Sequence, residues 1–132
     1  MSVTAFHQAF QGLLTPSSDF KASIGGRFRY AGDIQAQAVT LPYAAWLTVY
    51  CEPRDEFGAA VHERMVQVDI YAASMAEAVA VADKARALFG GATAVVTGMR
   101  PMTFQAGSII GPMREEAEWR VTLELVALTE ES

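Results

Sequence analysis

The amino-acid sequence predicts an α+β fold: an antiparallel β-sheet with two helices packed on one face and long projecting hairpin loops. Three observations lead to this prediction. Apolar residues recur at steps of three and four in residues 3–14 and 78–89, as on one face of a helix. Apolar and polar residues alternate in residues 64–71 and 118–128, as in half-buried strands. The segments follow one another as helix, strands, helix, strands, and residues 1–132 are expected to form a single domain with one core.

The first half of the chain is expected to hold one helix and two strands. The helix of residues 3–14 ends at residues 15–18, where a proline and two serines interrupt the pattern. After Gly25-Gly26, basic and aromatic side chains alternate over residues 27–30, which predicts a short strand with one solvated face. Residues 43–50 are rich in aromatic and β-branched residues, which predicts a second strand.

The middle of the chain gives the clearest signals. Residues 64–71 have the period of a half-buried strand. Ser74 followed by Glu77 is typical of a capping box, because the hydroxyl and the carboxylate can each accept a backbone N–H of the first helical turn. A helix is therefore expected from this point, with its apolar stripe in residues 78–89 and its end at Gly90-Gly91.

The last third is expected to contain two strands and a loop. Residues 94–104 are predicted to form a strand with a bulge at Gly98. Residues 105–113 contain two glycines and a proline, which indicates a loop. Residues 118–128 are predicted to cross the sheet with one face in the core, leaving residues 129–132 as a solvated tail.

The composition favours a folded protein and argues against several functions. Hydrophobic residues make up 52% of the chain and charged residues 19%, as in a packed globule. The apolar runs are too short for a membrane span, and no secretory signal is apparent. A net charge of −5 argues against binding nucleic acid through phosphate neutralisation. Residues 111–132 hold two arginines and six glutamates, so one end of the domain is expected to be acidic.

The sequence offers no convincing catalytic, cofactor or metal site. Its histidines, His7 and His62, are expected to pack or lie at the surface, and the single cysteine, Cys51, to be a half-buried residue at a strand end. The carboxylate pairs Asp55-Glu56 and Glu115-Glu116 are expected to be solvated surface charge. The glycines match neither a phosphate-binding loop nor a dinucleotide fingerprint, so the chain is predicted not to be an enzyme and to need no cofactor or metal.

Two predicted loops, residues 51–61 and 105–114, carry apolar side chains among charges. Apolar residues on projecting loops are costly to leave in water and often mark contacts with another subunit. The alternative is that both loops fold back on their own domain. The candidate interface residues are Arg54, Asp55, Glu56, Phe57, Ile109, Ile110 and Met113.

The whole pattern resembles the tail-terminator, or tail-completion, proteins of long-tailed bacteriophages and gene-transfer particles. The resemblance rests on the first helix, a Gly-Gly-Arg turn, Leu41-Pro42-Tyr43 opening a strand, and residues 66–74 leading into Glu77-Ala78. It runs over nearly the whole chain, and its motifs are hydrophobic and structural.

The resemblance implies a structural virion protein, made in the host cytoplasm and located in the tail or neck. It implies a homo-oligomer, a hexameric ring that caps the tail tube and joins it to the head connector protein, with DNA only passing through the lumen and no membrane contact. A ring needs heterologous interfaces, which the loops and exposed sheet edges could supply. The rival hypotheses are a small dimeric ligand-binding or adaptor module with a ferredoxin-like sheet and an enzyme in which Cys51 meets a histidine.

Overall fold

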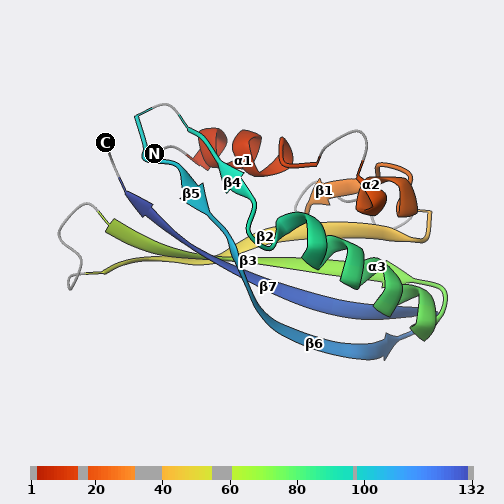
Figure 1. Cartoon of the computed structure of the whole chain (residues 1–132). Coiled ribbons are helices and arrows are strands. Elements are labelled where there is room, and N and C mark those ends of the chain that lie inside the picture. The colour runs from red at the N-terminus through yellow and green to blue at the C-terminus, as the bar shows by residue number, and fades with distance from the viewer. Residues whose placement is uncertain (1–2, 15–17, 32–39, 55–60, 97, 131–132) are drawn as a thin grey trace.

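The computed structural model describes residues 3–14, 18–31, 40–54, 61–96 and 98–130. It has the predicted α+β architecture, with helices stacked on one side of a long sheet (Figure 1). The helices are α1 (Val3–Gln11), α2 (Asp19–Ser23) and α3 (Met75–Phe89). The strands are β1 (Phe28–Tyr30), β2 (Tyr43–Pro53), β3 (Val61–Ala72), β4 (Thr93–Ala94), β5 (Met102–Thr103), β6 (Gln105–Glu115) and β7 (Glu118–Glu130).

The main sheet has the strand order β1-β2-β3-β7-β6, and β4 and β5 form a separate two-stranded ribbon. Its centre is the antiparallel pair β3 and β7, which stay in register from Val61 opposite Glu130 to Ala72 opposite Trp119. Both strands are therefore longer than predicted. Thr129, assigned to a solvated tail by the sequence, is 2% exposed in β7, because β3 continues far enough to pair with it.

One edge of the sheet departs from the antiparallel prediction. β1 is parallel to β2, with Phe28 opposite Ala44. Two contacts hold the starts of these strands together: the Ala44 N–H donates to the Arg27 carbonyl at 2.9 Å, and Arg27 Nε donates to the Pro42 carbonyl at 3.0 Å. The two strands therefore begin side by side and run in the same direction.

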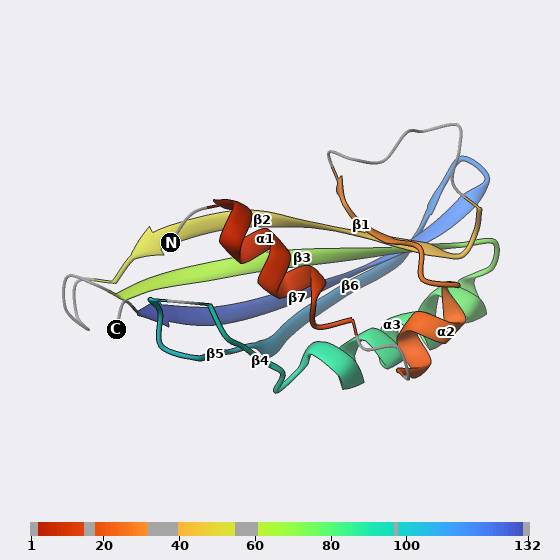
Figure 2. The same ribbon diagram turned by 90° about the horizontal axis from the view of Figure 1, so that it is seen from above.

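The core lies between the sheet and the helices, which Figure 2 shows over one face. Phe10 of α1 is fully buried, and its ring centroid is 4.6 Å from that of Trp46, 5.2 Å from Phe89 and 5.3 Å from Phe104. It joins residues from α1, β2, α3 and the approach to β6. Aromatic packing at these separations is favourable in tilted and offset arrangements.

Helix α3 agrees closely with its prediction. The Glu77 N–H donates to Ser74 Oγ at 3.2 Å, and Glu77 Oε1 accepts the Ala73 N–H, so the capping residues are those that the sequence indicated. Gly90 is the C-cap, and Gly91 has a φ of +86°. The buried stripe of the helix is Ala78, Val81, Ala82, Ala85 and Phe89.

The short helix α2 was not predicted. Ser18 caps it by accepting the Lys21 N–H at 3.1 Å, and Phe20 is buried 5.7 Å from the Phe28 ring and 5.6 Å from the Phe89 ring. Five residues are too few to show a helical period in the sequence. Its position depends on packing against α3 and β1.

The predictions for residues 94–113 were wrong in two respects. The predicted strand over residues 94–104 is reduced to the short strands β4 and β5, and the predicted loop over residues 105–113 is the long strand β6. β6 accommodates its glycines and proline through two register shifts against β7, between Ala106 and Ile109 and between Ile110 and Met113. Residues 55–60 of the other predicted loop lie outside the described part of the chain.

Candidate assembly surface

The candidate interface residues in the C-terminal half of the chain lie on β6, an outer strand of the sheet. Ile109, Ile110 and Met113 of β6 are 39%, 44% and 39% exposed. Ile110 pairs with Thr122 and Met113 with Arg120, so these two side chains lie on the face of the sheet away from the helices. The predicted apolar exposure is therefore present, and a strand positions it more rigidly than the predicted loop would.

Gly111 allows β6 to approach β7 closely at this point. Its φ is +105°, and a Cβ there would lie 2.8 Å from the Arg120 carbonyl oxygen. A larger residue would meet both backbone strain and a clash with the neighbouring strand. Gly111 thus sets the course of the strand between Ile110 and Met113.

The hairpin between β6 and β7 is acidic. Arg120 pairs with Glu115 at 2.8 Å, and Arg114 Nε donates to the Glu116 carbonyl at 3.4 Å. Burial and the negative charges of Glu115 and Glu116 raise the pKa of Glu118 above its ordinary value. The sequence predicted the pair Glu115-Glu116 to be solvated surface charge, and the hairpin brings Glu118 close to both.

The face of the sheet away from the helices has a polar centre. Asp69 is only 6% exposed, and its carboxylate accepts hydrogen bonds from Thr122 Oγ1 at 2.6 Å and from Gln67 Nε2 at 3.0 and 3.1 Å. The sequence placed Asp69 on this face but not in a buried network. The contact with Thr122 joins residues 53 positions apart, which strand pairing brings together.

A tyrosine pair lies beside this network. The Tyr43 and Tyr71 rings stack with their centroids 4.8 Å apart. Burial, followed by the charge of Glu118, raises the pKa of Tyr43 to about 12. Burial and the charge of Asp69 raise the pKa of Tyr71 as well. Both phenols are therefore held in their neutral form by an apolar setting and nearby carboxylates.

This environment predicts a pH dependence. Because the pKa of Tyr43 is higher in the folded protein than its ordinary value of 10.0, its contribution to stability is complete below pH 10 and is lost as the pH rises towards 12. Phenolate absorbance should show a tyrosine that titrates near 12 in the folded protein, and Tyr43→Phe should remove it. The denatured protein provides the control, and titration of all tyrosines near 10 in the folded state would contradict the prediction.

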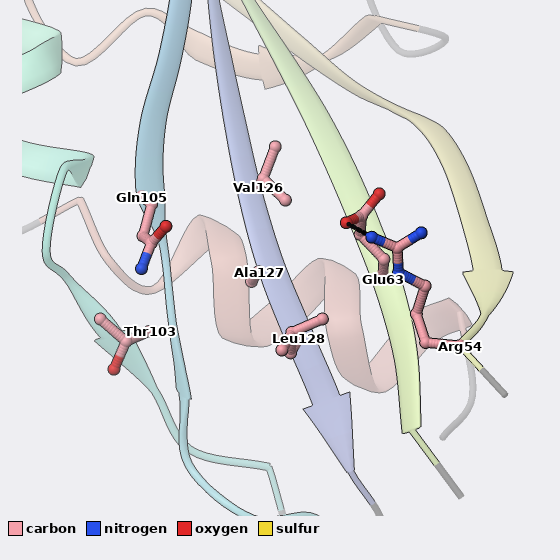
Figure 3. Close-up of a pocket in the computed structure, with 7 residues that line it drawn as sticks. All are labelled: Arg54, Glu63, Thr103, Gln105, Val126, Ala127 and Leu128. Atoms are coloured by element: carbon pink, nitrogen blue, oxygen red, sulfur yellow. Dashed lines mark ion pairs between the residues drawn. The ribbon is translucent and has the colours of Figure 1, made fainter. Parts of the chain in front are cut away.

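The other predicted interface segment borders a groove at the far end of the sheet. The groove has a volume of about 340 Å³ (Figure 3), and its lining includes Arg54, Glu63 and Leu128. Arg54 pairs with Glu63 at 2.9 Å, and Glu63 also accepts the Tyr50 hydroxyl at 2.6 Å. Gln105, at the start of β6, lies in the same lining. The groove was not predicted, because its residues come from four strands and the end of β2.

The structure brings only part of the predicted interface together. Ile109, Ile110 and Met113 follow one another along β6, and Arg54 lies near the start of that strand rather than beside Met113. Asp55, Glu56 and Phe57 lie outside the described residues. The described candidates thus lie on the outer strand β6 and, across the sheet from it, just after β2.

The candidate catalytic residues line none of the described grooves. His7 packs between aromatic rings, with centroids 5.0 Å from Trp46 and 5.3 Å from Tyr30. Cys51 is exposed on β2, not half-buried as predicted. It is opposite Arg64, and His62 is opposite Pro53 on the same pair of strands, so Cys51 and His62 are diagonal neighbours on one face. Neither histidine, nor the cysteine, lines any of the grooves formed by the described residues at Glu63, at Pro101 or at Phe20.

The described ranges hold neither a cluster of metal ligands nor a membrane-spanning helix. No group of three or more histidine, cysteine, aspartate or glutamate residues there could hold a metal ion. None of the helices in the same ranges is long and apolar enough to cross a membrane.

Comparison with known proteins identifies a shared fold. No protein-family model matches the sequence, and no curated protein matches it. Among solved structures, a chain described as "Virion of native gene transfer agent (GTA) particle" superposes with a TM-score of 0.74 at 21% identity, covering 96% of each chain. The two chains share one fold. A second solved structure with no stated function superposes with a TM-score of 0.66 at 18% identity, covering 100% of this chain and 98% of the other.

Proposed function

We propose that this protein is a structural component of a phage-like virion, in which it forms a ring that closes the tail tube and joins it to the head connector. The observation that carries the proposal is the fold shared with the gene transfer agent virion chain over 96% of both chains. The resemblance of the sequence pattern to tail-terminator proteins supports the same proposed function.

The exposed surface is suited to a closed ring. In a ring, one patch of each subunit meets a different patch of the next, so two unlike surfaces are required. One is the outer strand β6, with Ile109, Ile110 and Met113 exposed. The other lies across the sheet at β1 and β2. We propose a hexamer, as in the family that the sequence resembles.

The proposed partners are other copies of the chain, the tail tube protein and the head connector protein. DNA would only pass through the lumen, because a chain with a net charge of −5 does not hold phosphates. The protein would thus be located in the tail or neck of the particle. Its role is proposed to be non-catalytic, because His7, His62 and Cys51 line none of the grooves formed by the described residues.

Native mass measurement over a range of concentrations tests the ring, both with the protein alone and with purified tail tubes. The expected species is a hexamer, and electron microscopy should show it at one end of each tube. A monomer alone that becomes a ring on tubes would also agree. A protein that stays monomeric or dimeric in both conditions would contradict the proposal, and a ligand-filled dimer would favour the rival binding module.

A further inference from the structure

The two edges of the main sheet are unequally covered. β1 pairs only with Ala44–Trp46 of β2, so the stretch of β2 from Leu47 to Pro53 has no strand on its outer side among the described residues. At the other edge of the sheet, the outer side of β6 also has no strand paired to it among the described residues. Long open edges carry unpaired backbone groups, and native proteins usually cover them or pair them.

The strand directions make these two edges compatible. β2 is antiparallel to β3, β3 to β7, and β7 to β6, so β6 runs opposite to β2 within one subunit. When two copies stand side by side in the same orientation, as in a ring, β6 of one therefore meets β2 of the next in antiparallel fashion. A two-fold dimer would instead bring an edge onto its own copy.

We propose that the subunits join edge to edge, with β6 of one subunit pairing antiparallel to the open outer side of β2 in the next, so that the sheet continues around the ring. This inference rests on the proposed ring and identifies its interface. Pro112 has no N–H to donate, so backbone pairing is expected over residues 105–110 and side-chain contacts beyond them.

Exposed side chains match in order along the two edges. The first edge runs from β1 to the open part of β2. Its exposed residues in that direction are Arg29 and then Val49, which is 47% exposed. The second edge is β6, followed from the β6–β7 hairpin back towards the start of the strand. In that direction the acidic hairpin comes first and Ile110, which is 44% exposed, comes next. Arg29 therefore approaches the hairpin glutamate Glu116, while Val49 and Ile110 bury each other.

The charges on the two sides are complementary. Lys21, Arg27 and Arg29 lie at or beside β1, whereas Glu115, Glu116 and Glu118 gather at the β6–β7 hairpin. Burial first, and then the negative charges of Glu115 and Glu116, raise the pKa of Glu118, so these neighbouring carboxylates disfavour one another's charge. A cation from the next subunit relieves this repulsion, which favours a second copy of the chain as the occupant of the edge.

The native cysteine provides a direct test. Tyr50 and Ile110 both lie on the face away from the helices, and antiparallel pairing of these two places Cys51 of one subunit opposite position 109 of the next, both on the helix face. Ile109 and Cys51 are both exposed, and Cys51 is the only cysteine in the chain. Directly opposed residues of antiparallel strands lie within disulfide reach. Mild oxidation of Ile109→Cys should therefore link neighbouring subunits covalently.

The expected result is a ladder of linked species on a non-reducing gel, from dimer up to the full ring. The parent protein, Ile109→Cys combined with Cys51→Ser, and Ala80→Cys on the exposed side of α3 should give no ladder. A ring by native mass without this ladder would overturn the edge pairing and leave the proposed function standing. Covalent dimers from one cysteine alone would indicate a two-fold contact and overturn it too. The absence of any ring would contradict the proposed function itself.

A charge exchange tests the same interface if the cysteine variant fails to fold. Arg29→Glu should lower the fraction of protein in rings, and adding Glu116→Arg in the same chain should restore it. Restoration is expected because each interface again pairs opposite charges. No loss with Arg29→Glu, or a loss that Glu116→Arg leaves unchanged, would overturn the proposed order of contacts.

Discussion

Phe10→Ala is expected to lower the free energy of unfolding by about 3–5 kcal/mol, the usual range for removing a buried aromatic ring. Phe10 is fully buried and has ring neighbours from α1, β1, β2, α3 and the segment before β6. Truncation would leave a cavity where the first helix joins the sheet, and the rings around it cannot all collapse into the space. For a domain of this size, such a loss is a large part of its total stability.

Chemical denaturation of the isolated protein measures this effect. Gln8→Ala, an exposed position on the same helix, is the matched control and should change stability by less than about 0.5 kcal/mol. A small loss with Phe10→Ala would mean that α1 contributes little to the core. In that case, the aromatic cluster would depend mainly on Trp46, Phe89 and Phe104.

Ile110→Asp is expected to abolish ring assembly while leaving the subunit folded. Ile110 is 44% exposed in the subunit, so a carboxylate there stays solvated and costs the fold little. In the proposed interface, the same carboxylate would be buried without a partner, which weakens each contact about tenfold or more. A ring repeats this contact between every pair of subunits, so the loss accumulates.

Val79→Asp is the matched control, because Val79 is 40% exposed on α3, on the helical side of the sheet, whereas Ile110 lies on the opposite face. Thermal midpoints should be similar for the two variants, and native mass should show rings only for Val79→Asp. Assembly by both variants would place the subunit contact elsewhere. Loss of assembly by Val79→Asp alone would point to the helical side of the domain.

The elements with strong local signals were predictable from the sequence. Strand β3 and helix α3 follow from the alternation of residues 64–71 and from the capping pair Ser74 and Glu77. These signals belong to neighbouring residues, so they persist whatever the rest of the chain does. The exposure of Ile109 and Ile110 was also predicted, although they were assigned to a loop.

Strand β6 shows why local signals can mislead. Its glycines and proline indicated a loop, yet it pairs with β7 because bulges and the close approach at Gly111 absorb the irregular residues. The partner strand supplies the hydrogen bonds that decide the conformation. This pairing produces no strand-like alternation within residues 105–115 themselves.

The sequence by itself determined the fold class, the helical stripe of α3, the central strands and the apolar character of the candidate surface. Only the tertiary structure decided the parallel pairing of β1, the formation of α2, the burial of Asp69 against Thr122 and the two open edges. The physical reason is the range of the interactions. Periodicity and capping act within a few residues, whereas edges and buried networks exist only after distant strands have paired.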